Sequence, residues 1–131
     1  MSNEEDTFEK LYEKQADNQR LICKKGLYRD FVSEEDNDLI VYDGLPKDNT
    51  HLASYHIQQL VSEIGEVLDA DKRWKNMRND KYDKEAKKEE LADCFIVLMN
   101  ISMFSGIDAA ELYEAIDKKI DAVKERIQSQ S

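Results

Sequence analysis

Long stretches of helical spacing, broken by very few glycines and a single proline, constrain this chain more than any other feature. Only four Gly and one Pro occur in 131 residues, and these are the residues that usually mark turns and the ends of helices. Charged residues make up 37% of the chain and hydrophobic residues 40%, a mixture typical of helices with one buried and one solvated face. We therefore expect an all-α fold in one domain spanning residues 1–131.

Apolar residues spaced three and four apart predict four helices. We expect them at about residues 5–25, 50–77, 84–106 and 108–127. The segment at about residues 27–49 has a different character, because acidic turn-forming residues alternate there with short apolar runs. It is predicted to be a long ordered loop that contains a short extended piece, and loops of this length are usually functional.

Polar residues at the starts of these segments predict where the helices begin. Asn49 or Thr50 can cap the second helix, and Asp108 can cap the fourth. In the third helix, the run from Leu91 to Phe104 is densely apolar. That run predicts a helix that is largely buried.

The charge balance narrows the classes of function. The formal net charge is −10, so the mean field of the chain repels nucleic-acid backbones and anionic lipid surfaces. The N-terminus is acidic and polar, and no run is apolar enough for a membrane span. Cys23 and Cys94 match no metal-binding spacing and are expected to be reduced thiols. We expect a cytoplasmic protein with no nucleic-acid or membrane partner.

Two pairs of acidic residues share one spacing on the second and third predicted helices. Glu63 and Glu66 are three residues apart, as are Glu90 and Asp93, so each pair lies on one side of its helix about one turn apart. If the two helices pack together, the four carboxylates meet. A single acidic pair in such a chain is ordinarily a solvated helix face, but the two pairs together indicate a site.

The stripe that carries Glu90 and Asp93 continues through Asn100 along the most apolar helix, so Asp93 and Asn100 are predicted to be buried. A buried carboxylate is unfavourable unless a cation, a hydrogen bond or a metal compensates it. No Lys or Arg shares these stripes, and the histidines and cysteines have no zinc spacing, which favours Mg²⁺ or Mn²⁺. The chemistry indicated is phosphoryl transfer, in which metal ions neutralise a polyphosphate and one carboxylate orients or deprotonates the attacking water.

Positive charge and the only tryptophan follow the first acidic pair. Lys72, Arg73 and Lys75 flank Trp74. These cations can hold phosphates, or they can stabilise the C-terminal end of the helix through its dipole. Trp74 can stack on a base, or it can pack in a core or a subunit interface. The sequence leaves both interpretations open.

Asn100 and His56 also have two interpretations each. Asn100 can contact a sugar or a phosphate, or it can hydrogen-bond a neighbouring helix and set its register. His56 precedes Glu63 and Glu66 on one helical stripe, so it can approach the acidic residues or simply pack.

These residues resemble a known superfamily. The segment Glu63-Ile64-Gly65-Glu66, followed by Glu89-Glu90-Leu91-Ala92-Asp93, looks like the ExxE and ExxD signature of MazG-like nucleoside triphosphate pyrophosphohydrolases and dimeric dUTPases. The match covers roughly residues 52–126. Asn100, seven residues after Asp93, and the Lys72 to Lys75 segment with Trp74 are similar to the family as well.

The resemblance implies a four-to-five-helix bundle that is completed by oligomerisation into a homodimer or a homotetramer. It implies Mg²⁺-dependent hydrolysis of (deoxy)nucleoside triphosphates to the monophosphate and pyrophosphate, a reaction that cleans the nucleotide pool. The family's metal ligands and catalytic residues correspond to Glu63, Glu66, Glu90 and Asp93. Its substrate-binding positions correspond to Lys72, Trp74, Lys75 and Asn100.

Two other functions compete with this interpretation. A narrow dUTPase or dCTPase is favoured by the Trp74 segment, whereas the segment Cys94 to Val97 departs from the dUTPase pattern and argues against uracil specificity. A non-catalytic helical interaction module, in which the acidic residues only keep a bundle soluble, belongs to a different class. Activity on a nucleotide panel and the effect of Mg²⁺ on the melting temperature separate these alternatives.

Overall fold

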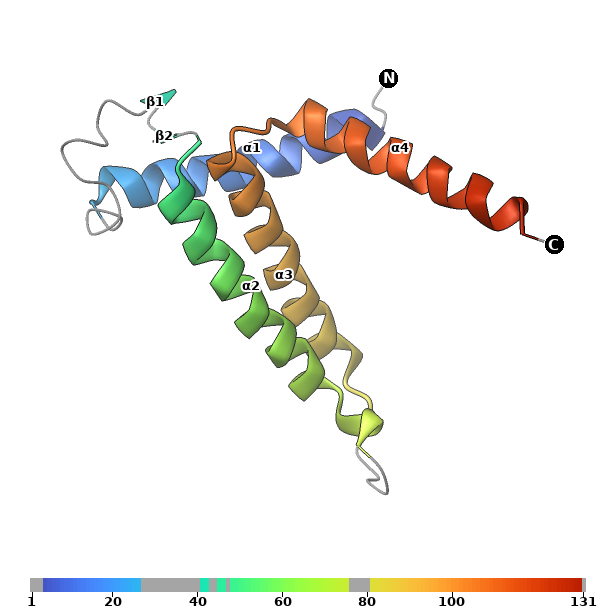
Figure 1. Cartoon of the computed structure of the whole chain (residues 1–131). Coiled ribbons are helices and arrows are strands. Elements are labelled where there is room, and N and C mark those ends of the chain that lie inside the picture. Colours follow the sequence, from blue (N-terminus) through green and yellow to red (C-terminus); the bar gives the residue numbers. More distant parts are fainter. Residues whose placement is uncertain (1–3, 27–40, 43–44, 47, 76–80, 131) are drawn as a thin grey trace.

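The computed structural model describes residues 4–26, 41–42, 45–46, 48–75 and 81–130, and its architecture is all-helical (Figure 1). The long helices are α1 (Glu4–Lys24), α2 (Thr50–Ala70), α3 (Lys84–Phe104) and α4 (Ala109–Gln128). A short 3-10 helix, η2 (Lys72–Trp74), follows α2. The prediction of an all-α fold with four helices in these places is confirmed.

The predicted loop lies mostly outside the described residues. Within it, the two-residue strands β1 (Val41–Tyr42) and β2 (Leu45–Pro46) pair in antiparallel register, with Val41 opposite Pro46 and Tyr42 opposite Leu45. This pair is the short extended piece that the sequence predicted.

Side-chain caps fix the starts of the helices. The Asn49 side chain accepts a hydrogen bond from the Leu52 backbone N–H at 3.0 Å, which starts α2. Asp83 caps α3 in the same way. At α4, Asp108 and Glu111 form a reciprocal capping box. These contacts satisfy backbone donors that have no partner within the helix, and they confirm Asn49 and Asp108 as caps.

The predicted end of the second helix was wrong. That helix was expected to reach Met77, but α2 ends at Ala70 because Asp71 adopts an extended backbone conformation with φ −138° and ψ 94°. The Asp71 carboxylate, itself buried, accepts from the Arg73 backbone and guanidinium and forms an ion pair with Lys87 of α3 at 3.2 Å. This carboxylate satisfies several donors, so the chain leaves the helix at Asp71 and begins η2. Residues 76–80 lie outside the described residues.

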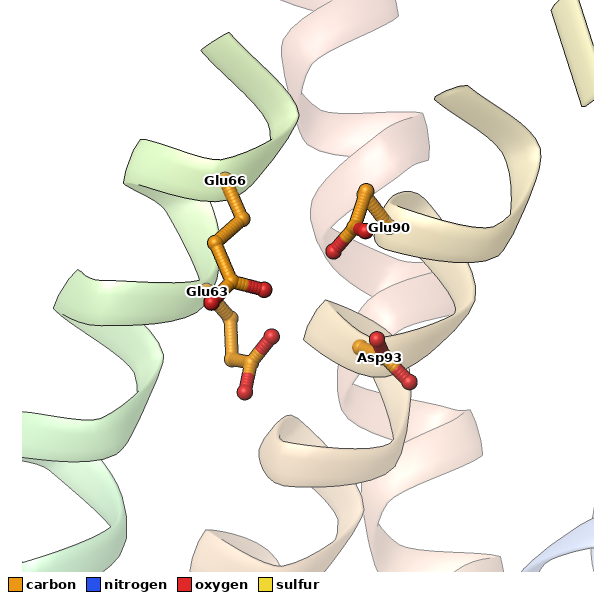
Figure 2. Close-up of side chains that lie close together, drawn as sticks. All are labelled: Glu63, Glu66, Glu90 and Asp93. Atoms are coloured by element: carbon orange, nitrogen blue, oxygen red, sulfur yellow. The ribbon is translucent and has the colours of Figure 1, made fainter. Parts of the chain in front are cut away.

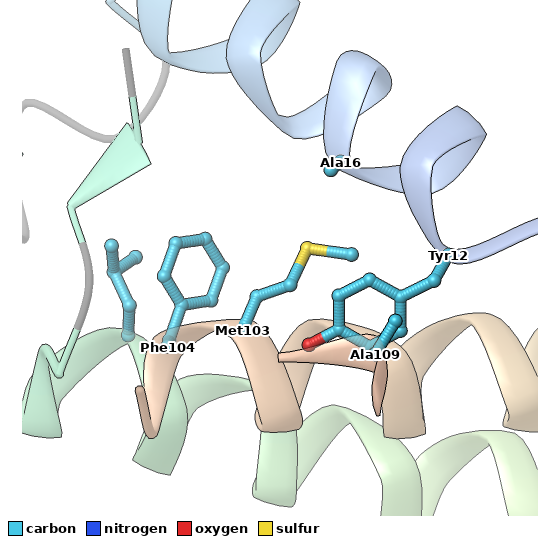
Figure 3. Close-up of a cluster of buried hydrophobic side chains, with 6 residues drawn as sticks. Tyr12, Ala16, Met103, Phe104 and Ala109 are labelled. Atoms are coloured by element: carbon cyan, nitrogen blue, oxygen red, sulfur yellow. The ribbon is translucent and has the colours of Figure 1, made fainter. Parts of the chain in front are cut away.

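Helices α2 and α3 pack side by side as an antiparallel hairpin, and α1 and α4 lie across one end of it (Figure 1). The hydrophobic core sits at this crossing and contains Leu52 and Phe104, with almost no exposed surface, together with Tyr12, Ala16, Met103 and Ala109 (Figure 3). The His56 ring stacks on Phe104 with ring centroids 5.4 Å apart. The core therefore connects the four helices at one end of the hairpin, and the described elements at its other end are α2, η2 and α3.

Helix α3 is buried less than its apolar run predicted. Its C-terminal part is buried from Ser102 to Phe104, where α1 covers it. Further down the hairpin, Cys94 and Val97 are buried, but Leu91, Phe95 and Leu98 are exposed. The reason is that α2 is the element packed against this half of α3, and one neighbouring helix can cover only part of another's circumference.

Among the described residues, no single helix combines the length and the apolar character of a membrane span. The bent pair of α3 and α4, with 116° between them, meets that criterion by length and composition only.

Candidate metal centre

The four predicted acidic residues meet between α2 and α3 (Figure 2). Glu63 and Glu66 project from α2, and Glu90 and Asp93 project from α3. One carboxylate oxygen of each residue can be chosen so that all four atoms lie within 4.8 Å of one another. The helices run antiparallel, so two pairs with three-residue spacing face each other at the same height of the hairpin. The predicted convergence of the two pairs is confirmed.

The four side chains divide into an inner and an outer pair. Glu63 and Glu90 are half-buried, whereas Glu66 and Asp93 are exposed. The prediction that Asp93 is buried was wrong. Asn100, on the same expected stripe, is buried as predicted, but closer to the start of α3 the buried position falls on Cys94, and Asp93 lies beside it at the edge of the stripe.

One oxygen of each inner carboxylate lacks a compensating partner. The Oε2 atoms of Glu63 and Glu90 are buried from solvent and have no hydrogen-bond partner among the described residues. None of the ion pairs found in the described part of the chain involves any of the four acidic residues. A buried carboxylate oxygen without a donor or a cation is unfavourable. Its natural complement is a proton or a metal ion.

Glu66 joins the two inner residues. Its carboxylate is within hydrogen-bonding reach of Glu63 and of Glu90. Burial raises the pKa of Glu63, and the charges of Glu66 and Asp93 raise it further. The pKa of Glu90 is raised first by its hydrogen bond with Glu66, and then by burial and by the neighbouring charges. Glu63 and Glu90 therefore hold a proton more strongly than isolated carboxyl groups do.

The donor set fits a hard divalent cation. All four side chains offer oxygen, the ligand atom that Mg²⁺ and Mn²⁺ prefer. Cys94 lies close to the cluster. We did not predict this from the sequence, although Cys94 follows Glu90 by four residues and therefore lies on the same side of the helix. Burial raises the pKa of the Cys94 thiol, and the charges of all four acidic residues raise it further. Cys94 therefore stays protonated and is a poor metal ligand.

Asn100 belongs to the contact between helices. It is buried, and its Oδ1 accepts a hydrogen bond of 2.8 Å from Nε2 of Gln15 on α1. Asn100 lies about two turns along α3 from Asp93. This contact matches the second interpretation of Asn100, in which it fixes the position of a neighbouring helix. His56 likewise packs on Phe104 and hydrogen-bonds Gln59.

The other predicted substrate-binding residues lie at the far end of the hairpin. Trp74 donates through Nε1 to the Leu68 carbonyl at 3.0 Å, and Lys75 Nζ lies 5.4 Å from the Trp74 ring centroid. Lys72 and Trp74 belong to η2. Trp74 and Lys87 border a cavity of about 340 Å³, and none of the four acidic residues lines it. The described structure therefore brings the acidic residues together but does not join Lys72, Trp74, Lys75 or Asn100 to them.

Replacing Glu63 with glutamine should raise the melting temperature of the metal-free protein at about pH 7.5 and change it little at about pH 4. The folded-state pKa of Glu63 is raised, so its favourable contribution exists below the unfolded-state pKa and is lost as the pH rises through the folded-state value. Glutamine never acquires the charge. Thermal unfolding in EDTA at the two pH values measures the difference.

The control is Glu89→Gln, which removes the same charge from an exposed neighbour. An equal rise in melting temperature for both variants at neutral pH would assign the effect to net charge. It would contradict a specific destabilisation by the four clustered carboxylates.

Comparison with known proteins adds no assignment. No family model, no curated protein and no solved structure matches this chain. The functional argument therefore rests on the geometry and chemistry of the four acidic residues.

Proposed function

We propose that this protein is a Mg²⁺-dependent pyrophosphohydrolase that cleaves (deoxy)nucleoside triphosphates to the monophosphate and pyrophosphate. The observation that carries the proposal is the acidic quartet, Glu63, Glu66, Glu90 and Asp93, with buried carboxylate oxygens that lack a partner. The resemblance of its two motifs to those of MazG-like enzymes supports the choice of reaction. Mn²⁺ is the expected substitute for Mg²⁺.

The inner and outer pairs suit different tasks. Glu63 and Glu90 would hold the metal through their buried oxygens, and Glu66 would hold it together with Glu90 from the solvent side. When bound, Mg²⁺ would neutralise the charge of the polyphosphate and favour attack at phosphorus. The exposed carboxylates of Glu66 and Asp93 lie where substrate and water arrive. They are therefore the groups that can orient the attacking water and accept its proton.

The proposed reaction balances without another reactant. The water oxygen forms a bond to the α-phosphorus, and the bond between that phosphorus and the oxygen bridging to the β-phosphorus breaks. Pyrophosphate leaves with that bridging oxygen, and the proton of the water passes to a carboxylate of the quartet. Catalysis then consists mainly of positioning and charge neutralisation, as in other phosphoryl transfers.

The rest of the substrate site is proposed with the same reaction. Lys72, Trp74, Lys75 and Asn100 stay as predicted contacts, although the described structure does not join them to the quartet. Self-association into a homodimer or a homotetramer is part of the proposal, because the resemblance to MazG-like enzymes implies it. The two cysteines are unpaired thiols, in keeping with the proposed cytoplasmic setting.

A nucleotide panel tests the proposal. Purified protein is incubated with dATP, dGTP, dCTP, dTTP, dUTP and the ribonucleotides, with Mg²⁺ or with EDTA, and pyrophosphate and monophosphate are quantified. We expect equal amounts of both products, formed only with the metal. Release of orthophosphate would indicate cleavage at a different bond, and no turnover of any nucleotide would reject the enzyme in favour of a helical interaction module. Activity confined to dUTP or dCTP would select the narrow alternative.

A further inference from the structure

One face of the α2–α3 hairpin is apolar, and none of the other described elements covers it. On α2, Ile57, Val61, Ile64 and Leu68 follow steps of four, three and four, and all four are exposed. On α3, Leu91, Phe95 and Leu98 follow steps of four and three, and all three are exposed. Such spacing places each set in a narrow stripe along its helix. We call the two stripes together the hairpin face.

The hairpin face points away from the acidic quartet. At 3.6 residues per turn, the centre of the α2 stripe lies about 130° from Glu63 and about 170° from Glu66 around the helix. By the same reckoning, the α3 stripe lies about 105° from Glu90 and about 165° from Asp93. Covering the hairpin face would therefore leave the quartet open to solvent.

The two stripes lie on the same side of the hairpin. A single cavity is lined by Ile64 and Leu68 from the α2 stripe and by Lys87 of α3. Lys87 lies four residues before Leu91, so it occupies the same side of α3 as the start of the α3 stripe. The stripes are thus neighbours across the hairpin and form one surface.

Gly65 gives an independent indication that something approaches this surface. It lies in the interior of α2, where glycine costs about 1 kcal/mol relative to alanine. Its φ is not positive, and a Cβ atom added to it would meet nothing within 4 Å. Gly65 lines the same cavity as Ile64 and Leu68. Nothing in the described chain requires a glycine here, whereas the close approach of another backbone would.

The hairpin face is self-complementary. Val61 and Ile64 lie at the middle of the α2 stripe and Phe95 at the middle of the α3 stripe. Because the four carboxylates of the quartet meet, residues 63 and 66 of α2 lie level with residues 90 and 93 of α3 along the length of the hairpin. Both stripes are therefore centred at nearly one height. A two-fold axis through that height, perpendicular to the helices, would place the apolar face on its own copy, as closed dimers require.

We propose that a second copy of this chain packs on the hairpin face, hairpin against hairpin, with Gly65 at the edge of the contact and the two quartets on the outer sides. This inference rests on the self-association included in the proposed function, and not on the hydrolysis.

The test compares three variants on the hairpin face, Val61→Lys, Phe95→Lys and Gly65→Leu, with a matched control, Ile120→Lys. Ile120 is 62% exposed on α4, close to the 64% of Phe95, so the control adds the same charge at an equally exposed apolar position. Sedimentation equilibrium measures the molecular mass over a range of concentrations. Helical circular dichroism and the Mg²⁺-dependent rise in melting temperature report whether each variant is folded.

We expect the wild type and Ile120→Lys to be dimers or larger, and each hairpin-face variant to raise the dissociation constant at least about 100-fold. The Mg²⁺ response should persist in all of them. A wild-type monomer at every concentration would reject both self-association and this interface. Dimers that survive the hairpin-face changes, or that dissociate in Ile120→Lys, would reject the interface while keeping self-association.

Discussion

Replacing Glu66 with glutamine should lower the rate of pyrophosphate release by at least about 100-fold, the scale of a lost carboxylate that acts as ligand or base. Glu66 raises the pKa of both Glu63 and Glu90, and its side chain is exposed to solvent. Glutamine keeps the size of the side chain but removes its charge and its ability to accept a proton. Steady-state rates at saturating Mg²⁺ and nucleotide measure the change.

Glu89→Gln is the matched control for that experiment. Glu89 is adjacent to Glu90 in the chain, exposed, and not a member of the quartet. It should keep nearly the full rate. Activity that is indifferent to Glu66→Gln, or that falls equally in both variants, would separate the reaction from the quartet.

Mg²⁺ should raise the melting temperature of the wild-type protein strongly. At 100 times its dissociation constant, a ligand that binds only the folded state adds about 2.7 kcal/mol to the free energy of unfolding. For a chain of this size, this corresponds to a rise of roughly 10 °C. The physical source is the relief of the buried, partnerless oxygens of Glu63 and Glu90. Differential scanning calorimetry in EDTA, Mg²⁺ and Mn²⁺, at constant ionic strength, measures the rise.

The double variant with Glu63→Gln and Glu90→Gln tests the source of that stabilisation. In EDTA at neutral pH it should melt at a higher temperature than the wild type, because the mutual repulsion of the carboxylates is gone. It should then gain nothing from Mg²⁺. A rise with Mg²⁺ that persists in the double variant would place the ion elsewhere, and no rise in the wild type would favour the non-catalytic module.

Local signals made most of the helices predictable. Asn49 and Asp108 cap helices through hydrogen bonds to backbone groups three residues away, so a short window of sequence contains the whole interaction. The meeting of Glu63 and Glu66 with Glu90 was also predictable, because equal spacing on two adjacent helices leaves few arrangements.

The predictions from sequence were wrong where contacts between residues far apart in the chain determine the structure. The Asp71 carboxylate, at the end of α2, is bound by Arg73, two residues later, and by Lys87, sixteen residues later, and no local sequence pattern indicates the contact with Lys87. Asp93 is exposed because the line of contact between α3 and α2 decides which residue of each turn is buried, and in this turn that residue is Cys94, whereas Asn100 is buried as predicted. The exposure of Leu91 and Phe95 could not be foreseen, because an apolar run does not specify whether its partner belongs to the same chain.

The division of the quartet into an inner and an outer pair has a kinetic consequence. Since Glu66 and Asp93 face solvent, a hydrated ion can reach its first ligands while the hairpin stays closed. If the quartet binds Mg²⁺ as proposed, the rate of loading would be set by how fast the ion gives up its coordinated water, a step it makes reluctantly, and not by any opening of the protein. Metal that arrives already attached to a nucleotide would enter by the same route, so ion and substrate could come and go together in each turnover.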